Sequence, residues 1–212
     1  MTSAKLIRWS GLAAMIGGAM WTASWILVSF TEDGTRAVLG LSERGWETLL
    51  LNPAMLSFVA GLVGFHRKQR ERSGKLGKVG FVVGLLGVVT MLLGNSAEFW
   101  VFELFYGTQQ PGWAMMGVGF MMLPIGLILF GLDTVKARVF SGWRRAVPLV
   151  FGLTLVLEIL LVIAVMLVSG SRSQEGLLGA MVLTIAAGWV VLGYALWSEQ
   201  TEARSTMVAT DH

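Results

Sequence analysis

The stretch AVPLVFGLTLVLEILLVIAVMLV, Ala146–Val168, decides the fold of this chain. Its only charged residue is Glu158. A helix that crosses the hydrocarbon core of a bilayer needs about 20 largely apolar residues. The stretch meets this length with almost no interruption, so it predicts a membrane-spanning helix.

Five further runs have the same character. They are Trp9–Phe30, Thr48–Phe65, Val79–Tyr106, Trp113–Leu132 and Glu175–Trp197. The third is the longest and must tilt, kink or protrude from the bilayer. Only 14% of the 212 residues are charged, where soluble proteins average about 25%. The sequence therefore predicts an all-α membrane protein with one domain of six transmembrane helices over residues 1–197. A flexible cytoplasmic tail is expected at 198–212.

Basic residues give the orientation. With six spans, thirteen of the sixteen Lys and Arg residues lie on the side that holds both termini. Ten of them belong to two basic loops, residues 67–78 and 136–145. Positive charge marks cytoplasmic loops, so both termini are predicted to be cytoplasmic in a cell membrane. The loops are short and flank spans, which argues against nucleic acid as a partner. Their basic residues are expected to contact anionic lipid headgroups, although their role in setting the topology explains them equally well.

The two basic loops also suggest an internal repeat of about 68 residues. Arg70, Ser73, Gly74, Gly84 and Leu85 precede Arg138, Ser141, Gly142, Gly152 and Leu153 by that distance. One interpretation is three repeated helical hairpins, as parallel repeats occur in membrane carriers. The other is chance, because glycine-rich apolar sequence aligns easily with itself.

Small residues recur at four-residue spacing, which places them on one helix face and lets two backbones approach closely. The pairs are Ala13/Gly17, Ala14/Gly18, Ser57/Gly61 and Gly80/Gly84. These faces serve either packing within the chain or a homo-oligomer.

Glu158 is the first candidate for a ligand- or ion-binding residue. It lies near the middle of its span, and no Lys or Arg lies inside any of the six spans. A carboxyl group in hydrocarbon is costly and is a candidate functional group by default. Two interpretations remain: Glu158 binds a proton or cation, or it is neutral and bonded to a neighbouring helix.

Three other polar residues, Asn52, Asn95 and Glu98, lie toward the outer ends of the second and third spans. Together with Glu158 they are candidates to line an outward-facing cavity that binds a ligand or ion. An aromatic group surrounds the same region and predicts either an interfacial belt or an aromatic binding pocket. Its members are Trp100, Phe102, Phe105, Tyr106 and Trp113.

Motifs for catalysis and cofactors are lacking in the sequence. There is no cysteine, the two histidines are His66 and His212, and neither G-x-S-x-G nor H-E-x-x-H occurs. Asp133 is expected to be an interfacial charge near the basic loops. We therefore expect no enzyme activity, no metal site and no cofactor. The first functional hypothesis is a small carrier of an ion, a proton or a small solute. The alternative is a non-catalytic membrane subunit or a lipid-interacting scaffold.

Overall fold

The computed structural model describes residues 3–30, 43–102, 111–169 and 174–210, and these residues form helices and turns without a strand. Six helices are long and apolar enough to cross a membrane. They confirm the predicted all-α, six-helix membrane architecture. Large apolar side chains are exposed on all of them, as a surface in contact with lipid requires.

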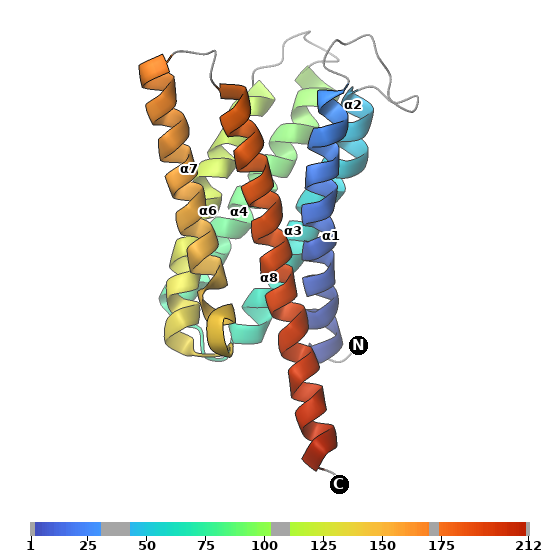
Figure 1. Ribbon diagram of the computed structural model, residues 1–212, viewed down its shortest axis with the longest axis vertical. Helices are drawn as coiled ribbons and strands as arrows, with labels where there is room; N and C mark the ends of the chain where they lie inside the picture. Colours follow the sequence, from blue (N-terminus) through green and yellow to red (C-terminus); the bar gives the residue numbers. More distant parts are fainter. Residues whose placement is uncertain (1–2, 31–42, 103–110, 170–173, 211–212) are drawn as a thin grey trace.

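The elements follow one another along the chain as shown in Figure 1. They are α1 (Ser3–Ser29), α2 (Glu43–Trp46), the π-helix η1 (Glu47–Leu51), α3 (Asn52–Gln69), α4 (Lys75–Ala97), the π-helix η2 (Glu98–Phe102), α6 (Pro111–Ala137), the 3₁₀-helix η3 (Gly142–Ala146), α7 (Val147–Ser169) and α8 (Gln174–Thr210).

Two predicted boundaries differ from the structure. The apolar run Val79–Tyr106 is not one α-helix, because α4 gives way to η2 at Glu98; residues 103–106 lie outside the described part. The segment expected as a tail from residue 198 continues α8 as a helix as far as Thr210. The flexibility of that segment stays a prediction.

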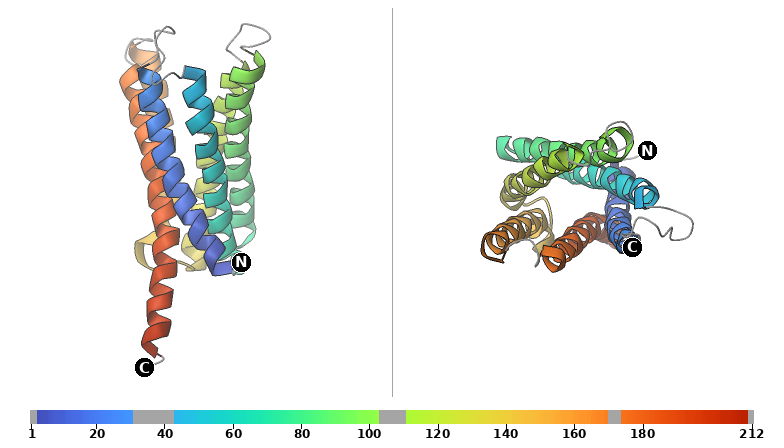
Figure 2. Two further views of the ribbon diagram at one scale, coloured as in Figure 1. Left: turned by 90° about the vertical axis from the view of Figure 1, so that its right-hand side faces the viewer. Right: turned by 90° about the horizontal axis from the view of Figure 1, so that it is seen from above.

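The six long helices form a ring in chain order. α1 packs on α3, α3 on α4, α4 on α6, α6 on α7 and α7 on α8, and α8 closes the ring against α1 (Figure 2). α4 and α6 make the most extensive contact, and α7 is the least buried of the six. Consecutive helices are antiparallel, so the fold consists of three successive hairpins.

Glycine allows the closest contacts in this ring. A Cβ on Gly80 of α4 would lie 2.3 Å from the backbone N of Phe130, and one on Gly126 of α6 would lie 2.2 Å from the backbone N of Gly84. Any side chain at these positions would push the two helices apart. The contact between α4 and α6 therefore depends on glycine on both helices.

The other small-residue faces are also used within the chain. Gly17 and Gly61 contact Ser57 and Ala14 across the α1–α3 interface, and Gly18 contacts Ala186 of α8. The structure thus supports the interpretation that these faces pack within one chain. A second copy of the chain would have to bind elsewhere.

Aromatic residues fill the middle of the ring. Phe58 of α3 stacks on Trp189 of α8 with ring centroids 4.3 Å apart, and Phe151 of α7 meets the same indole edge-on. Trp21 of α1 contacts Phe58 on one side and Phe120 of α6 on the other. These contacts connect five helices through one aromatic column.

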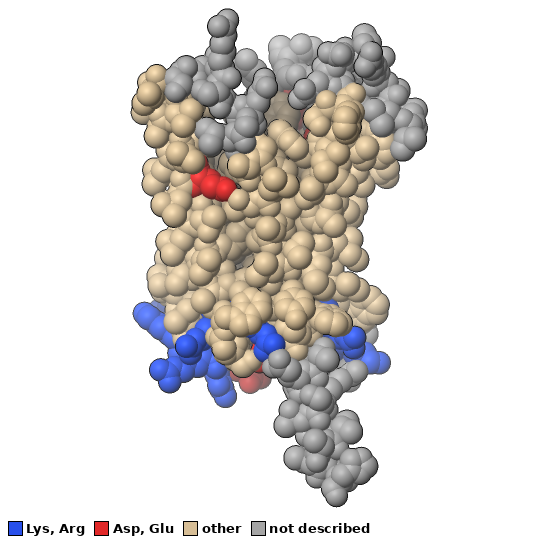
Figure 3. All heavy atoms as spheres, in the orientation of Figure 1, with Lys and Arg blue, Asp and Glu red and all other residues tan. Residues whose placement is uncertain are grey.

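The described Lys and Arg side chains gather at the end of the bundle where both termini lie, which we call the basic end (Figure 3). The opposite end is called the far end. Separation of charge along the bundle agrees with the loop count from the sequence. Which end faces the cytoplasm stays a prediction.

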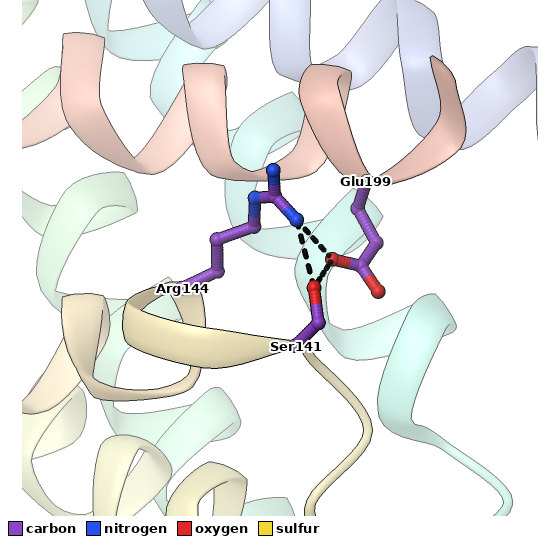
Figure 4. A network of polar contacts seen from close by, with 3 residues as sticks. All are labelled: Ser141, Arg144 and Glu199. Atoms are coloured by element: carbon purple, nitrogen blue, oxygen red, sulfur yellow. Dashed lines mark hydrogen bonds and ion pairs between the residues drawn. The ribbon is translucent and has the colours of Figure 1, made fainter. Parts of the chain in front are cut away.

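The two basic loops resemble each other only in part. Ser73 donates a hydrogen bond to Asp133, near the end of α6, and Ser141 donates one to Glu199 of α8. Arg144 reinforces the second contact by an ion pair of 3.1 Å with Glu199 (Figure 4). The backbones differ, however: Gly74 has a φ of −77° and its counterpart Gly142 one of +54°. Equivalent serines therefore serve similar contacts in loops of different conformation.

Candidate functional site

Glu158 lies on α7 at the seam with α8. Thr184 of α8 donates a hydrogen bond to its Oε1, and Oε2 has no hydrogen-bond partner among the described residues. The side chain is half-buried. Glu158 is thus bonded to a neighbouring helix, which is one of the two states expected from the sequence.

Asn52 and Asn95 lie together at the far end. The Asn95 Nδ2 donates a hydrogen bond of 2.9 Å to the Asn52 Oδ1 and so ties α4 to α3. Asn95 is only 1% exposed, and its Oδ1 has no hydrogen-bond partner among the described residues. Buried polar groups normally form hydrogen bonds, so this oxygen is an unused acceptor within the described packing.

Glu98 lies one turn beyond Asn95, at the junction between α4 and η2. It is 1% exposed, and its Oε2 accepts a hydrogen bond of 3.2 Å from the backbone N–H of Trp113. Trp113 belongs to the first turn of α6, where the helix dipole favours a carboxylate. The structure therefore brings Asn52, Asn95 and Glu98 into one region and leaves Glu158 apart on α7.

Both π-helices lie at this same end of the bundle. η1 runs directly into Asn52, and η2 begins at Glu98. Pro53 lacks a backbone N–H and crowds the preceding turn. The Asn52 N–H bonds to the carbonyl of Glu47, five residues earlier instead of the four of an α-helix, and this bond widens the turn. Single-turn π segments are frequent at functional sites.

A cavity of about 600 Å³ opens in the half of the bundle toward the far end. Its walls come from α1, η1, α6, α7 and α8. Aromatic and sulfur-containing side chains make up much of the lining: Trp21, Trp25, Trp113, Phe120, Met116, Met121, Met166 and Met181. The remaining wall is mainly aliphatic and includes Ile159 and Val162 of α7. A pocket of this size and polarity suits an apolar ligand.

Two polar side chains lie in the cavity wall. Ser24 of α1 is 1% exposed, and its Oγ has no hydrogen-bond partner among the described residues. Glu47, the first residue of η1, is 6% exposed. Few polar groups in an apolar wall are typical of sites that orient an amphipathic ligand.

The cavity changes the assignment of site residues made from sequence. None of Asn52, Asn95, Glu98 and Glu158 lines it, although Glu98 bonds to the backbone of the lining residue Trp113. Of the predicted aromatic group, Trp113 contributes to the wall and Trp100 is half-exposed; the side chains of Phe102, Phe105 and Tyr106 lie outside the described part. The pairing of Trp21 with Trp25, one helical turn apart, was a signal for this wall that the sequence analysis did not use.

The basic end holds polar contacts of a structural kind. The Asp133 carboxylate accepts hydrogen bonds from the Ser73 hydroxyl and the Gly74 backbone N–H, at the start of α4. It therefore caps a helix N-terminus, which adds a partner to its predicted interfacial position. His66 stacks on Phe81 with ring centroids 4.0 Å apart. Within the described residues, no three acidic or histidine side chains lie close enough to hold a metal ion.

Comparisons of this chain with protein-family models, curated proteins and solved structures gave no match.

Proposed function

We propose that this membrane protein binds a lipid-like ligand in the cavity at the far end, in a non-catalytic role. The observation that carries the proposal is the wall itself. It combines three indole rings, four methionines and only two polar side chains around about 600 Å³. Such a lining recognises an acyl chain or another flexible apolar group, because methionine adapts its shape to its neighbour.

Physical reasoning favours a filled cavity. Protein interiors are close-packed, and empty volume costs stability in proportion to its size. Water gains too few hydrogen bonds in an apolar wall to fill such a space well. In a bilayer, the most abundant filler is an acyl chain or a lipophilic molecule dissolved among the chains.

Gly117 provides a test of this proposal. It lines the cavity, and a Cβ at this position would meet no heavy atom within 4 Å. Leucine at position 117 therefore adds volume beside the cavity without a clash at Cβ. Gly179 of α8 has the same open surroundings but does not line the cavity, so Gly179→Leu is the matched control.

The experiment is native mass spectrometry of the protein released from mild detergent. We expect the wild type and Gly179→Leu to retain a bound lipid-like molecule and Gly117→Leu to lose most of that occupancy. Equal retention by all three proteins would place the binding elsewhere. A wild-type protein that retains no such molecule, even after incubation with lipid, would contradict the proposal.

A second candidate function, carriage of a proton or cation, rests on Glu158. Its Oε2 has no described partner, and the next residue, Ile159, lines the cavity. Glu158 could therefore exchange an ion between the α7–α8 seam and the cavity after a small movement of α7. The test is proton or cation flux in liposomes, with Glu158→Gln beside the wild type. Flux that is absent from the wild type rules this candidate out.

The basic end supports a further part of the proposal, contact with anionic headgroups. Exposed basic side chains cluster there on both basic loops: Arg67, Arg70, Arg72, Lys75, Lys78, Lys136, Arg138 and Arg145. Each such charge near an anionic surface contributes about 1 kcal/mol. A scaffold or subunit role, with or without a second copy, would use the lipid-facing surfaces, because the glycine faces are occupied within the chain.

A further inference from the structure

We infer that the ligand of the cavity is a neutral amphiphile, an apolar chain that ends in an uncharged oxygen-bearing head such as an alcohol, and that the Ser24 hydroxyl binds this head. The inference rests on the proposed function and adds the class of ligand to it. Three observations carry it: the unused hydrogen-bonding capacity of Ser24, the position of Ser24 in the wall, and the helices on which the wall is exposed.

Ser24 differs from the other hydroxyl side chains described on α1. Ser10, Thr22 and Ser29 each donate a hydrogen bond to the backbone carbonyl three or four residues earlier. A serine or threonine within a helix commonly satisfies its hydroxyl in this way. Ser24 is 1% exposed, and its Oγ has no hydrogen-bond partner among the described residues. It can therefore donate a hydrogen bond to a ligand and accept one from it.

The wall around Ser24 favours an uncharged partner. Lys, Arg and His are lacking from the described lining, and Glu47, its other polar side chain, already interacts within the protein. A charged head would exchange its water for a single hydroxyl, and an ion in an apolar wall without a charged partner is costly. An alcohol or a carbonyl loses much less hydration, and one hydrogen bond to Ser24 compensates that loss.

Ser24 lies at the shallow end of the cavity. It is five residues from the end of α1 at Ser29, about 7.5 Å along the helix axis. Phe120 is nine residues from the start of α6 and Ile159 ten residues from the end of α7, so both lie about 13 to 15 Å from the far end. The wall thus continues as an apolar surface beyond Ser24, toward the middle of the bilayer. An amphiphile in one leaflet has the same arrangement, with its head near the surface and its chain toward the centre.

Most of the exposed wall residues lie on α6 and α7. These helices pack closely near the basic end, where a Cβ on Gly131 of α6 would lie 2.3 Å from the backbone N of Leu149, and they diverge toward the far end (Figures 1 and 2). Met121 of α6 and Ile163 of α7 line the cavity, and each is 46% exposed. Because both helices are membrane spans, an opening at this level leads to the acyl chains. A ligand that enters there must dissolve in the bilayer, as a neutral amphiphile does.

The test uses four compounds with a chain of ten carbons: decanol, chlorodecane, decylamine and decanoate. Calorimetry at neutral pH measures their binding to the wild type, Ser24→Ala and Ser10→Ala in zwitterionic nanodiscs, with empty nanodiscs as the reference. Each compound is compared between proteins, so its own partition into the bilayer cancels.

The wild type should bind decanol more tightly than decylamine or decanoate, because the charged heads lose their hydration in the wall. Ser24→Ala should bind decanol about fivefold more weakly, since one hydrogen bond is lost, and chlorodecane as well as the wild type does. Ser10→Ala is the matched control: its hydroxyl bonds within α1 and does not line the cavity, so this variant should bind all four compounds like the wild type.

Three results would overturn the inference: an equal loss of affinity for decanol and chlorodecane in Ser24→Ala, an unchanged affinity for both, or tighter binding of decylamine or decanoate than of decanol to the wild type. Each of them would leave the apolar ligand site standing. The absence of saturable binding of any compound would overturn the proposed function as well. If Ser24→Ala fails to fold, Ser24→Cys provides the second variant, because a thiol is a weak donor and acceptor. It should also weaken decanol selectively, and undiminished binding of decanol would contradict the role given to Ser24.

Discussion

Glu158 of α7 accepts a hydrogen bond from Thr184 of α8, and this bond joins two helices that otherwise contact each other sparingly. Both residues lie in membrane-spanning segments, and 26 positions separate them in sequence. A bond between side chains of two spans holds their register where apolar packing is weak. The carboxyl group at the centre of the fifth span therefore has a structural task, whatever it binds in addition.

Replacing Thr184 with valine keeps the shape of the side chain and removes the donor. We expect Thr184→Val to lower the free energy of unfolding by about 1 kcal/mol, the usual order for an interhelical hydrogen bond in a membrane. Thr154→Val is the control, because the Thr154 hydroxyl donates its hydrogen bond to the Val150 carbonyl of its own helix. Titration with SDS in mixed micelles measures both. Equal losses would show that the α7–α8 bond adds nothing beyond local helix structure.

The pair Asn52 and Asn95 predicts an unequal effect of two similar substitutions. Asn52→Leu removes the acceptor from Asn95, which is 1% exposed and whose Oδ1 already has no hydrogen-bond partner in the described part of the chain. Asn95→Leu removes that oxygen and leaves Asn52, which is only half-buried. Since a buried unsatisfied group costs about 1–3 kcal/mol, Asn52→Leu should destabilise the protein by about 1 kcal/mol more than Asn95→Leu. The opposite order in SDS titration would show that Asn95 obtains its partners elsewhere.

Removing the Ser24 hydroxyl should not destabilise the protein when the cavity holds no ligand. Its unsatisfied hydroxyl costs stability when no ligand is bound, so Ser24→Ala is expected to be neutral or to stabilise by up to about 1 kcal/mol. Ser10, on the same helix, donates a hydrogen bond to the Ile7 carbonyl, and Ser10→Ala should not stabilise. Thermal unfolding of delipidated protein distinguishes the two. A marked loss of stability in Ser24→Ala would mean that its hydroxyl has a partner within the protein.

Gly80 and Gly179 should differ strongly in their tolerance of an added side chain. An added Cβ at Gly80 would lie 2.3 Å from the backbone of Phe130, whereas one at Gly179 would meet nothing within 4 Å. Gly80→Ala should destabilise the protein by about 2–3 kcal/mol through overpacking of α4 against α6. Gly179→Ala should be neutral or stabilise by up to about 1 kcal/mol through helix propensity. If the expression level and unfolding temperature of the two variants are equal, the close α4–α6 contact is not as described.

The six spans could be predicted because each is a continuous apolar run. The gathering of basic side chains at one end of the bundle could be predicted because they belong to alternate loops. The end of α4 could not, since apolar residues resume directly after the polar positions Asn95, Ser96 and Glu98, where α4 changes to η2. Hydropathy measures transfer into lipid and does not respond to the switch from α- to π-helical bonds. The actual hydrogen-bond pattern depends on the partners that Asn95 and Glu98 find on α3 and α6.

The lining of the cavity escaped prediction for a different reason. Ser24 and Glu47 belong to α1 and η1, which contact each other across the same interface in which Gly17 and Gly61 let α1 pack closely on α3. Side chains from five elements share the wall, and no local pattern records the register between helices. Sequence reasoning instead chose Glu158, whose position in a span is unusual by itself. Its partner Thr184 lies on another helix at no characteristic spacing.

The orientation of the bundle remains to be measured, and the chain is well suited to it because it has no cysteine. Arg72→Cys places a single thiol on an exposed residue of the first basic loop, and Gln109→Cys places one in the sequence segment between the third and fourth spans. Positive charge is retained on the cytoplasmic side, so an impermeant maleimide should label only Gln109→Cys in intact cells. Both variants should react after permeabilisation, which controls for access to the thiol. Labelling of Arg72→Cys alone in intact cells would reverse the orientation, and would then place the cavity in the cytoplasmic half of the bilayer.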